Sequence, residues 1–215
     1  MKKAAVLWTG GKDSALALYE AKQSGYEINS LVTFTPESPN FLAHPLAVMK
    51  LQAEAVGLPH IEIKIAEPYK ESYEAAIQSL KKQGIGTLVT GDITEIDHCP
   101  NWIGECSKKS GMEVFAPLWY QDREYLLNHL LSKKFKIIFS CLKKPWFKDD
   151  SLLGIQLNKE TIDEVKLIAR STGMDICGEQ GEYHTWALDG PVFNKPLTVD
   201  YVKSNQDDLS YLRLL

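Results

Sequence analysis

The chain has 215 residues, of which 44% are hydrophobic and 24% are charged. This balance excludes a disordered chain and favours one full domain with a smaller one appended. There are 24 basic and 28 acidic residues, and the net charge of −4 does not favour a nucleic-acid partner. The first apolar run, residues 4–8, is too short for a signal-peptide core or a membrane span. We therefore expect a cytoplasmic protein that does not contact a membrane.

Short apolar runs alternate with segments of helical periodicity along the first 92 residues. Strands are expected at 4–8, 28–34, 61–65 and 87–90, with helices ending near Gly25, Gly57 and Gly84. Such alternation implies right-handed crossovers and a parallel sheet covered on both faces. The sequence therefore predicts an α/β fold with a doubly wound parallel sheet.

The pattern changes after residue 120. A helix is expected near 122–131, a buried strand at 135–140, and another helix between an Asn158 cap and a Gly173 stop. A glycine-rich segment at 178–190 precedes a short β-like tail at 196–202. These features predict a smaller C-terminal α+β domain, with domain limits of 1–125 and 126–215.

The four cysteines contain no Cys-x-x-Cys pair, so we expect reduced thiols. Close spacing of His98, Cys99 and Cys106 suggests metal ligands, but without a second paired set a packing or surface role is favoured. The aromatic pair Trp146-Phe147 lies among lysines and could stack on a base; packing against a sheet is the favoured interpretation.

Residues 9–14 read Thr-Gly-Gly-Lys-Asp-Ser and lie between the first expected strand and helix. Phosphate binds at this edge of α/β folds, where glycines let successive N–H groups face one anion and the helix N-terminus adds positive charge. The Lys12 ammonium and the Ser14 hydroxyl are further donors. A simple tight turn, with Asp13 or Ser14 as an N-cap, is the alternative.

Two common nucleotide-binding loops are excluded, each by two residues that do not match the pattern. The Walker A pattern fails at Val6 and Asp13, and the dinucleotide-binding pattern fails at Lys12 and Ala15. The segment resembles instead the PP-loop, SGGxDS, of ATP pyrophosphatases. Thr9 replaces the serine of that family and keeps its hydroxyl.

The resemblance extends to diphthine–ammonia ligases and their uncharacterised bacterial relatives. It is carried, besides the loop, by His44 with residues 51–59, by 91–93, and by 178–185 followed by 189–191. This resemblance implies a HUP fold of the adenine nucleotide alpha hydrolase type, with ATP and Mg²⁺ as cofactors. It also implies site residues. Nucleotide-binding candidates are Thr9, Gly10, Gly11, Lys12, Asp13, Ser14, Thr33, His44 and Gly91, with Asp13 as a weak Mg²⁺ ligand.

Three residues are catalytic candidates under the same resemblance: Lys12, Asp92 and Glu182. Substrate-binding candidates are Glu179, Glu182, His184 and Thr185, in a polar, glycine-flanked loop expected to be flexible and to face residues 9–14 across a cleft. Alternatives stay open: Asp92 as a helix N-cap, His44 as a surface histidine, and 178–185 as a solvated turn.

The reaction that this resemblance implies is carboxylate activation. A substrate carboxylate attacks the α-phosphorus of ATP, pyrophosphate leaves towards the loop, and ammonia or an amine displaces AMP. The acceptor is diphthine on elongation factor 2 or an unknown small molecule, and Glu182 is expected to serve this half of the reaction. A tRNA-modifying PP-loop adenylation enzyme and a non-catalytic adenine-nucleotide-binding protein are the alternatives. A homodimer is an open option.

Overall fold

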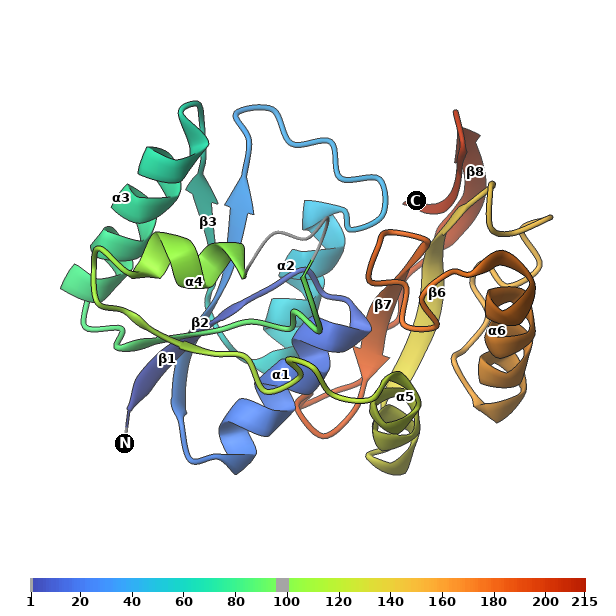
Figure 1. Ribbon diagram of the computed structural model, residues 1–215, viewed down its shortest axis with the longest axis horizontal. Coiled ribbons are helices and arrows are strands. Elements are labelled where there is room, and N and C mark those ends of the chain that lie inside the picture. Colours follow the sequence, from blue (N-terminus) through green and yellow to red (C-terminus); the bar gives the residue numbers. More distant parts are fainter. Residues whose placement is uncertain (1, 96–100) are drawn as a thin grey trace. The chain divides into compact units, whose positions relative to one another are not determined.

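The computed structural model describes residues 2–95 and 101–215, which form two compact units (Figure 1). Unit 1 comprises the described residues within 1–9, 13–40 and 57–120. Unit 2 comprises 10–12, 41–56 and 121–215. Two segments that the sequence suggested for the first domain, 10–12 and 41–56, thus group with unit 2.

Unit 1 contains a five-stranded parallel sheet in the order β3-β2-β1-β4-β5. Its strands are β1 (Lys3–Leu7), β2 (Glu27–Thr35), β3 (His60–Lys64), β4 (Thr87–Val89) and β5 (Glu113–Phe115). Because the order runs outwards from β1 in both directions, the predicted doubly wound fold is confirmed.

The helices that follow these strands are α1 (Lys12–Gln23), α3 (Tyr69–Lys82) and α4 (Trp102–Ser107). Ile77 and Leu80 of α3 pack on Ala5, Val32 and Leu88 of the sheet in a buried apolar cluster. Residues between β1 and α1 form the first strand-to-helix turn, as predicted. Sequence patterns missed α4 and β5, which are six and three residues long, because such short elements show no periodicity.

Unit 2 contains a four-stranded antiparallel sheet in the order β7-β6-β9-β8. The strands are β6 (Lys136–Lys143), β7 (Tyr183–Asp189), β8 (Tyr201–Gln206) and β9 (Leu209–Leu214), and the helices are α2 (Leu46–Val56), α5 (Arg123–Ser132) and α6 (Lys159–Thr172). The predicted small α+β domain is confirmed.

Local signals were accurate in α6 and inaccurate in the tail. The Asn158 side chain accepts from the Thr161 amide, and Gly173 ends the helix with φ 79°, as predicted. The tail expected at 196–202 is instead the β8–β9 hairpin, which covers 201–214. Within 2–95 and 101–215, no helix has both the length and the apolar character of a bilayer span.

Candidate active site

The loop between β1 and α1 presents two hydroxyl groups together. Thr9 Oγ1 donates to Ser14 Oγ at 3.3 Å, next to the N-terminus of α1. Gly91, which follows β4, packs directly on this turn, because a Cβ there would lie 2.7 Å from the carbonyl carbon of Asp13. Hydroxyls at a helix N-terminus, held by a glycine contact from the neighbouring strand, form a suitable cradle for phosphate.

Asp92 lies beyond the carboxyl end of β4 and is half-buried. Its carboxylate accepts from the Asn101 side-chain amide at 2.9 Å. Asn101, and not Asp92, is the N-cap of α4, so the alternative of a capping role for Asp92 is wrong. An acid at this edge is well placed for a nucleotide or its cation.

The glycine at the loop tip is held by a buried glutamine. Gln52 Nε2 donates to the carbonyl oxygens of Gly10 and Ala187, each at 2.8 Å, and the Ala187 amide donates to the same Gly10 oxygen at 2.9 Å. A Cβ on Gly10, whose φ is 73°, would lie 1.9 Å from Gln52 Oε1. The role of Gln52 was missed, although a glutamine in the apolar stripe of α2 was a usable signal.

Lys12 is 3% exposed and is held by the segment that leads into β7 and by β7 itself. Its amide donates to Thr185 Oγ1 at 3.0 Å, and its ammonium donates to the Cys177 carbonyl at 2.5 Å. The ammonium also lies 5.3 Å from the ring centroid of Tyr183. The Lys12 N–H thus bonds a threonine hydroxyl, and in this structure it is not one of the successive loop N–H groups expected to face an anion.

His44 and His184 form a contact pair within unit 2. His44 Nε2 and His184 Nδ1 are 3.2 Å apart, and the rings are nearly perpendicular. The preceding Ala43 carbonyl accepts from Ser140 Oγ at 3.1 Å and from Trp186 Nε1 at 2.8 Å, which anchors the segment that carries His44. His44 is thus half-buried and bonded to His184, and the surface alternative is wrong.

His184 should make stability depend on pH. Burial, and then the positive charges of Lys12 and Lys143, lower the pKa of His184 from 6.5 to about 4. Because the unfolded chain binds this proton more readily, the free energy of unfolding should fall by up to about 3 kcal/mol as the pH drops from 6.5 to 4. Urea unfolding of the wild type and of His184→Gln, at pH 4.5 and pH 7, measures this. Equal pH dependence in the two proteins would contradict the prediction.

Glu182 is buried, contrary to the expected flexible loop. It is 2% exposed; its Oε1 accepts from the Asp175 amide at 2.8 Å and its Oε2 from the Gln180 amide at 2.9 Å. Glu179 is half-buried in the same loop, and Thr185 lies in β7. The acidic loop is therefore ordered by its own backbone, and the solvated-turn alternative is wrong for Glu182.

Three polar groups lie at the carboxyl ends of β1 and β2. The Thr33 hydroxyl donates to the Trp8 carbonyl at 2.6 Å and contacts His60 Nε2 at 2.8 Å. The Trp8 indole N–H and the Thr35 hydroxyl are buried and have no hydrogen-bond partner in the described part of the chain. Since Leu7 and Phe34 pack into the core beneath α3, alternation places Trp8 and Thr35 on the opposite face of the sheet. Sequence patterns missed both residues.

Two family models match almost the whole chain. Residues 1–114 match the diphthamide synthase N-terminal domain, and residues 122–212 match the diphthamide synthase C-terminal domain. The chain belongs to the diphthamide synthase family. The resemblance inferred from residues 9–14, 91–93 and 178–185 is thereby confirmed.

Relatives of the family are similar over most of the chain. The diphthine–ammonia ligase of Mus musculus is 25% identical, and that of Homo sapiens 24%; each match covers 92% of this chain and 83% of the relative. The ligase of Schizosaccharomyces pombe is 25% identical over 97% of this chain and 38% of its own length. A crystal structure of a predicted tRNA methyltransferase subunit from Methanocaldococcus jannaschii is 20% identical, with a TM-score of 0.46, and covers 92% of this chain and 100% of its own.

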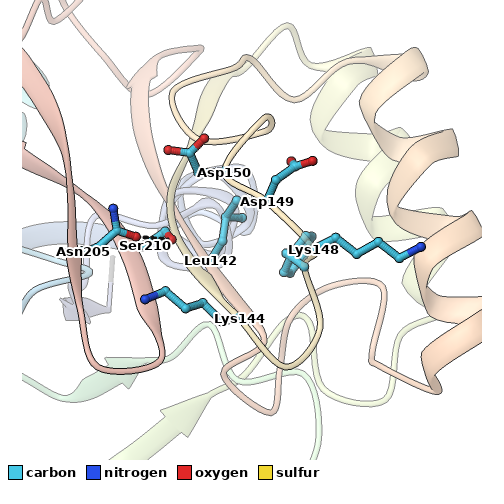
Figure 2. Close-up of a pocket in the computed structure, with 8 residues that line it drawn as sticks. Leu142, Lys144, Lys148, Asp149, Asp150, Asn205 and Ser210 are labelled. Atoms are coloured by element: carbon cyan, nitrogen blue, oxygen red, sulfur yellow. Dashed lines mark hydrogen bonds between the residues drawn. The ribbon is translucent and has the colours of Figure 1, made fainter.

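Unit 2 also contains a separate pocket. It has a volume of about 340 Å³ and lies between the segment after β6 and the β8–β9 turn (Figure 2). Its polar groups bond the protein itself: Lys144 donates to the Asp207 carbonyl, Asp149 accepts from the Ser151 amide, and Ser210 donates to Asn205. In Figure 2 the Lys148 side chain points away from these groups.

The sequence also suggested residues for metal binding and for base stacking. Within residues 2–95 and 101–215, no three His, Cys, Asp or Glu side chains are grouped to hold a metal alone. His98 and Cys99 lie outside the described residues, and Cys106 is a buried free thiol. Phe147 is buried against Tyr183, which confirms the packing interpretation for that ring.

Proposed function

We propose that this chain is an ATP-dependent ligase that adenylates a carboxylate and then converts it to an amide. The observation that carries the proposal is the match of both diphthamide synthase domains to one chain. The name of the relatives, diphthine–ammonia ligase, supports diphthine as the acceptor and ammonia as the nitrogen donor. Elongation factor 2 as the carrier of diphthine, a cytoplasmic location and a homodimer are parts of the same proposal.

The site has features that fit ATP. Phosphate oxygens suit the Thr9 and Ser14 hydroxyls and the N-terminus of α1. The Trp8 and Thr35 groups, which have no partner in the described part of the chain, suit the nucleoside, because buried donors and acceptors of this kind are usually satisfied by a ligand or water.

Mg²⁺ fits the same edge as a partner of the phosphates. It needs only one or two carboxylates beside phosphate oxygens, and Asp13 and Asp92 are the candidates that would hold it. When bound it would neutralise charge on the phosphates.

The proposed reaction has two chemical steps. The carboxylate oxygen bonds to the α-phosphorus, and the bond to the bridging oxygen breaks to release pyrophosphate. Ammonia then attacks the acyl carbon, loses a proton, and expels AMP. The charge of Lys12 stabilises the leaving phosphates, and Asp92 binds the nucleotide. Catalysis therefore depends on positioning and charge rather than on an enzyme nucleophile.

The test is product analysis. Purified protein is incubated with ATP labelled at the α-phosphate, ammonium and fractions of a cell extract, and AMP and pyrophosphate are measured. Acceptor-dependent formation of both supports a ligase. Release of neither with any fraction would contradict the ligase proposal, and dependence on an RNA fraction would indicate the tRNA-modifying alternative.

A nucleotide contact by Thr35 is tested by Thr35→Val. The substitution keeps the shape and removes a buried hydroxyl that has no hydrogen-bond partner among the described residues, so stability should not fall. If that hydroxyl bonds the nucleotide, the affinity for ATP should fall about tenfold, as measured by calorimetric titration. Ser30→Ala, which removes another β2 hydroxyl without a partner among the residues described, is the matched control. Unchanged affinity in Thr35→Val would contradict the contact.

A further inference from the structure

The loop before β7 is held by a dense set of contacts within unit 2. The Arg123 guanidinium donates to Asp175 Oδ2 at 2.9 Å, and Asp175 Oδ1 accepts from the Cys177 amide at 2.7 Å. The Tyr183 hydroxyl donates to the Ile176 carbonyl at 2.7 Å. These bonds fix residues 175–177 from α5, from within the loop and from β7.

The Glu182 carboxylate bonds both ends of this loop. Its two carboxylate oxygens accept the amides of Asp175 and Gln180, so one buried side chain spans the whole turn. Bonds from N–H groups to a carboxylate are among the stronger ones in proteins. Since both oxygens of Glu182 accept such bonds, the carboxylate has a structural role in the protein without ligand.

The loop in turn holds the ammonium of Lys12. The Cys177 carbonyl, in the middle of the turn that Glu182 closes, accepts from Lys12 Nζ at 2.5 Å. The Tyr183 ring, one residue after Glu182, lies 5.3 Å from the same ammonium. These two contacts with the Lys12 ammonium therefore both come from the segment anchored by Glu182.

We propose that Glu182 is a positioning residue, which sets the place of the Lys12 ammonium through the 175–180 turn and the Cys177 carbonyl. This inference rests on the proposed function in one respect, namely that the Lys12 charge stabilises the leaving phosphates. It assigns Glu182 to the ATP half of the reaction, in place of the acceptor half that the sequence suggested. A shift of this ammonium would reduce transition-state stabilisation while the remaining nucleotide contacts stay in place.

The test measures the chemical reactivity of Lys12 directly. The ATP-free protein is labelled with a trace of acetic anhydride, and acetylation of each lysine is measured by peptide mass spectrometry. Glu182→Gln keeps the shape but places an amide donor against a backbone N–H, so the turn should open and the labelling of Lys12 should rise about tenfold. Lys166, which is partly buried and paired with Glu124, is the internal reference for general loosening.

Each result of the labelling experiment either supports or overturns the inference. A selective rise at Lys12, absent in the exposed-site control Glu164→Gln, supports the inference. Folded Glu182→Gln with unchanged Lys12 labelling, or with an equal rise at Lys166, overturns it. If Glu182→Gln does not fold, Tyr183→Phe loosens the same turn by one bond and should still raise Lys12 labelling; no rise there also overturns it. The labelling needs no turnover, so failure of the ligase activity is seen separately, as no AMP formation by the wild type.

Discussion

Replacing Lys12 by alanine is expected to slow ATP-dependent adenylation by about 100- to 10,000-fold, or roughly 3–5 kcal/mol of transition-state stabilisation. The reason is that the buried ammonium of the loop at 9–14 is removed, in surroundings where charge is weakly screened. AMP formation from labelled ATP measures the rate.

Controls separate this loss from unfolding. Lys12→Met keeps much of the buried aliphatic chain and should lose activity equally, while Lys22→Ala removes a charge from the last turn of the same helix and should lose little. Circular dichroism and urea unfolding establish that each variant folds. A folded Lys12→Ala protein with normal AMP formation would refute the role of its charge.

Replacing Gly10 by alanine is expected to disrupt the loop and abolish measurable ATP binding. A left-handed φ of 73° costs an alanine about 1–2 kcal/mol. Its Cβ would also overlap Gln52 Oε1, and such overpacking typically costs about 1–3 kcal/mol more. The free energy of unfolding should therefore fall by about 2–5 kcal/mol, as measured with urea.

A matched glycine isolates the two causes. Gly25 has φ 80°, and no atom of residues 2–95 or 101–215 outside its own neighbours lies within 4 Å of the place that a Cβ would take. Gly25→Ala should therefore lose only about 1–2 kcal/mol and keep ATP binding. Trimming the obstructing side chain in Gly10→Ala/Gln52→Ala should recover part of the stability lost by Gly10→Ala. If Gly10→Ala behaves like Gly25→Ala, the Gln52 contact does not shape the loop.

The sequence alone was sufficient for the features that depend on near neighbours. The strand and helix alternation to residue 92, the turn at 9–14 and the Asn158 to Gly173 limits of α6 follow from local periodicity, capping and glycine conformation. Short elements such as α4 and β5 escaped because they form through packing rather than through local preference.

Tertiary structure alone decided how the candidate residues are used. The Lys12 amide bonds Thr185, 173 residues away, and its ammonium bonds the Cys177 carbonyl, 165 residues away. A backbone carbonyl has the same chemistry in every residue, so no pattern in the sequence marks Cys177 as the acceptor. Glu182 looked like an exposed acid of a flexible loop, but the fold buries it against two amides. Burial and long-range partners arise only when distant segments pack together, and they decide whether a polar side chain faces a ligand or supports the protein.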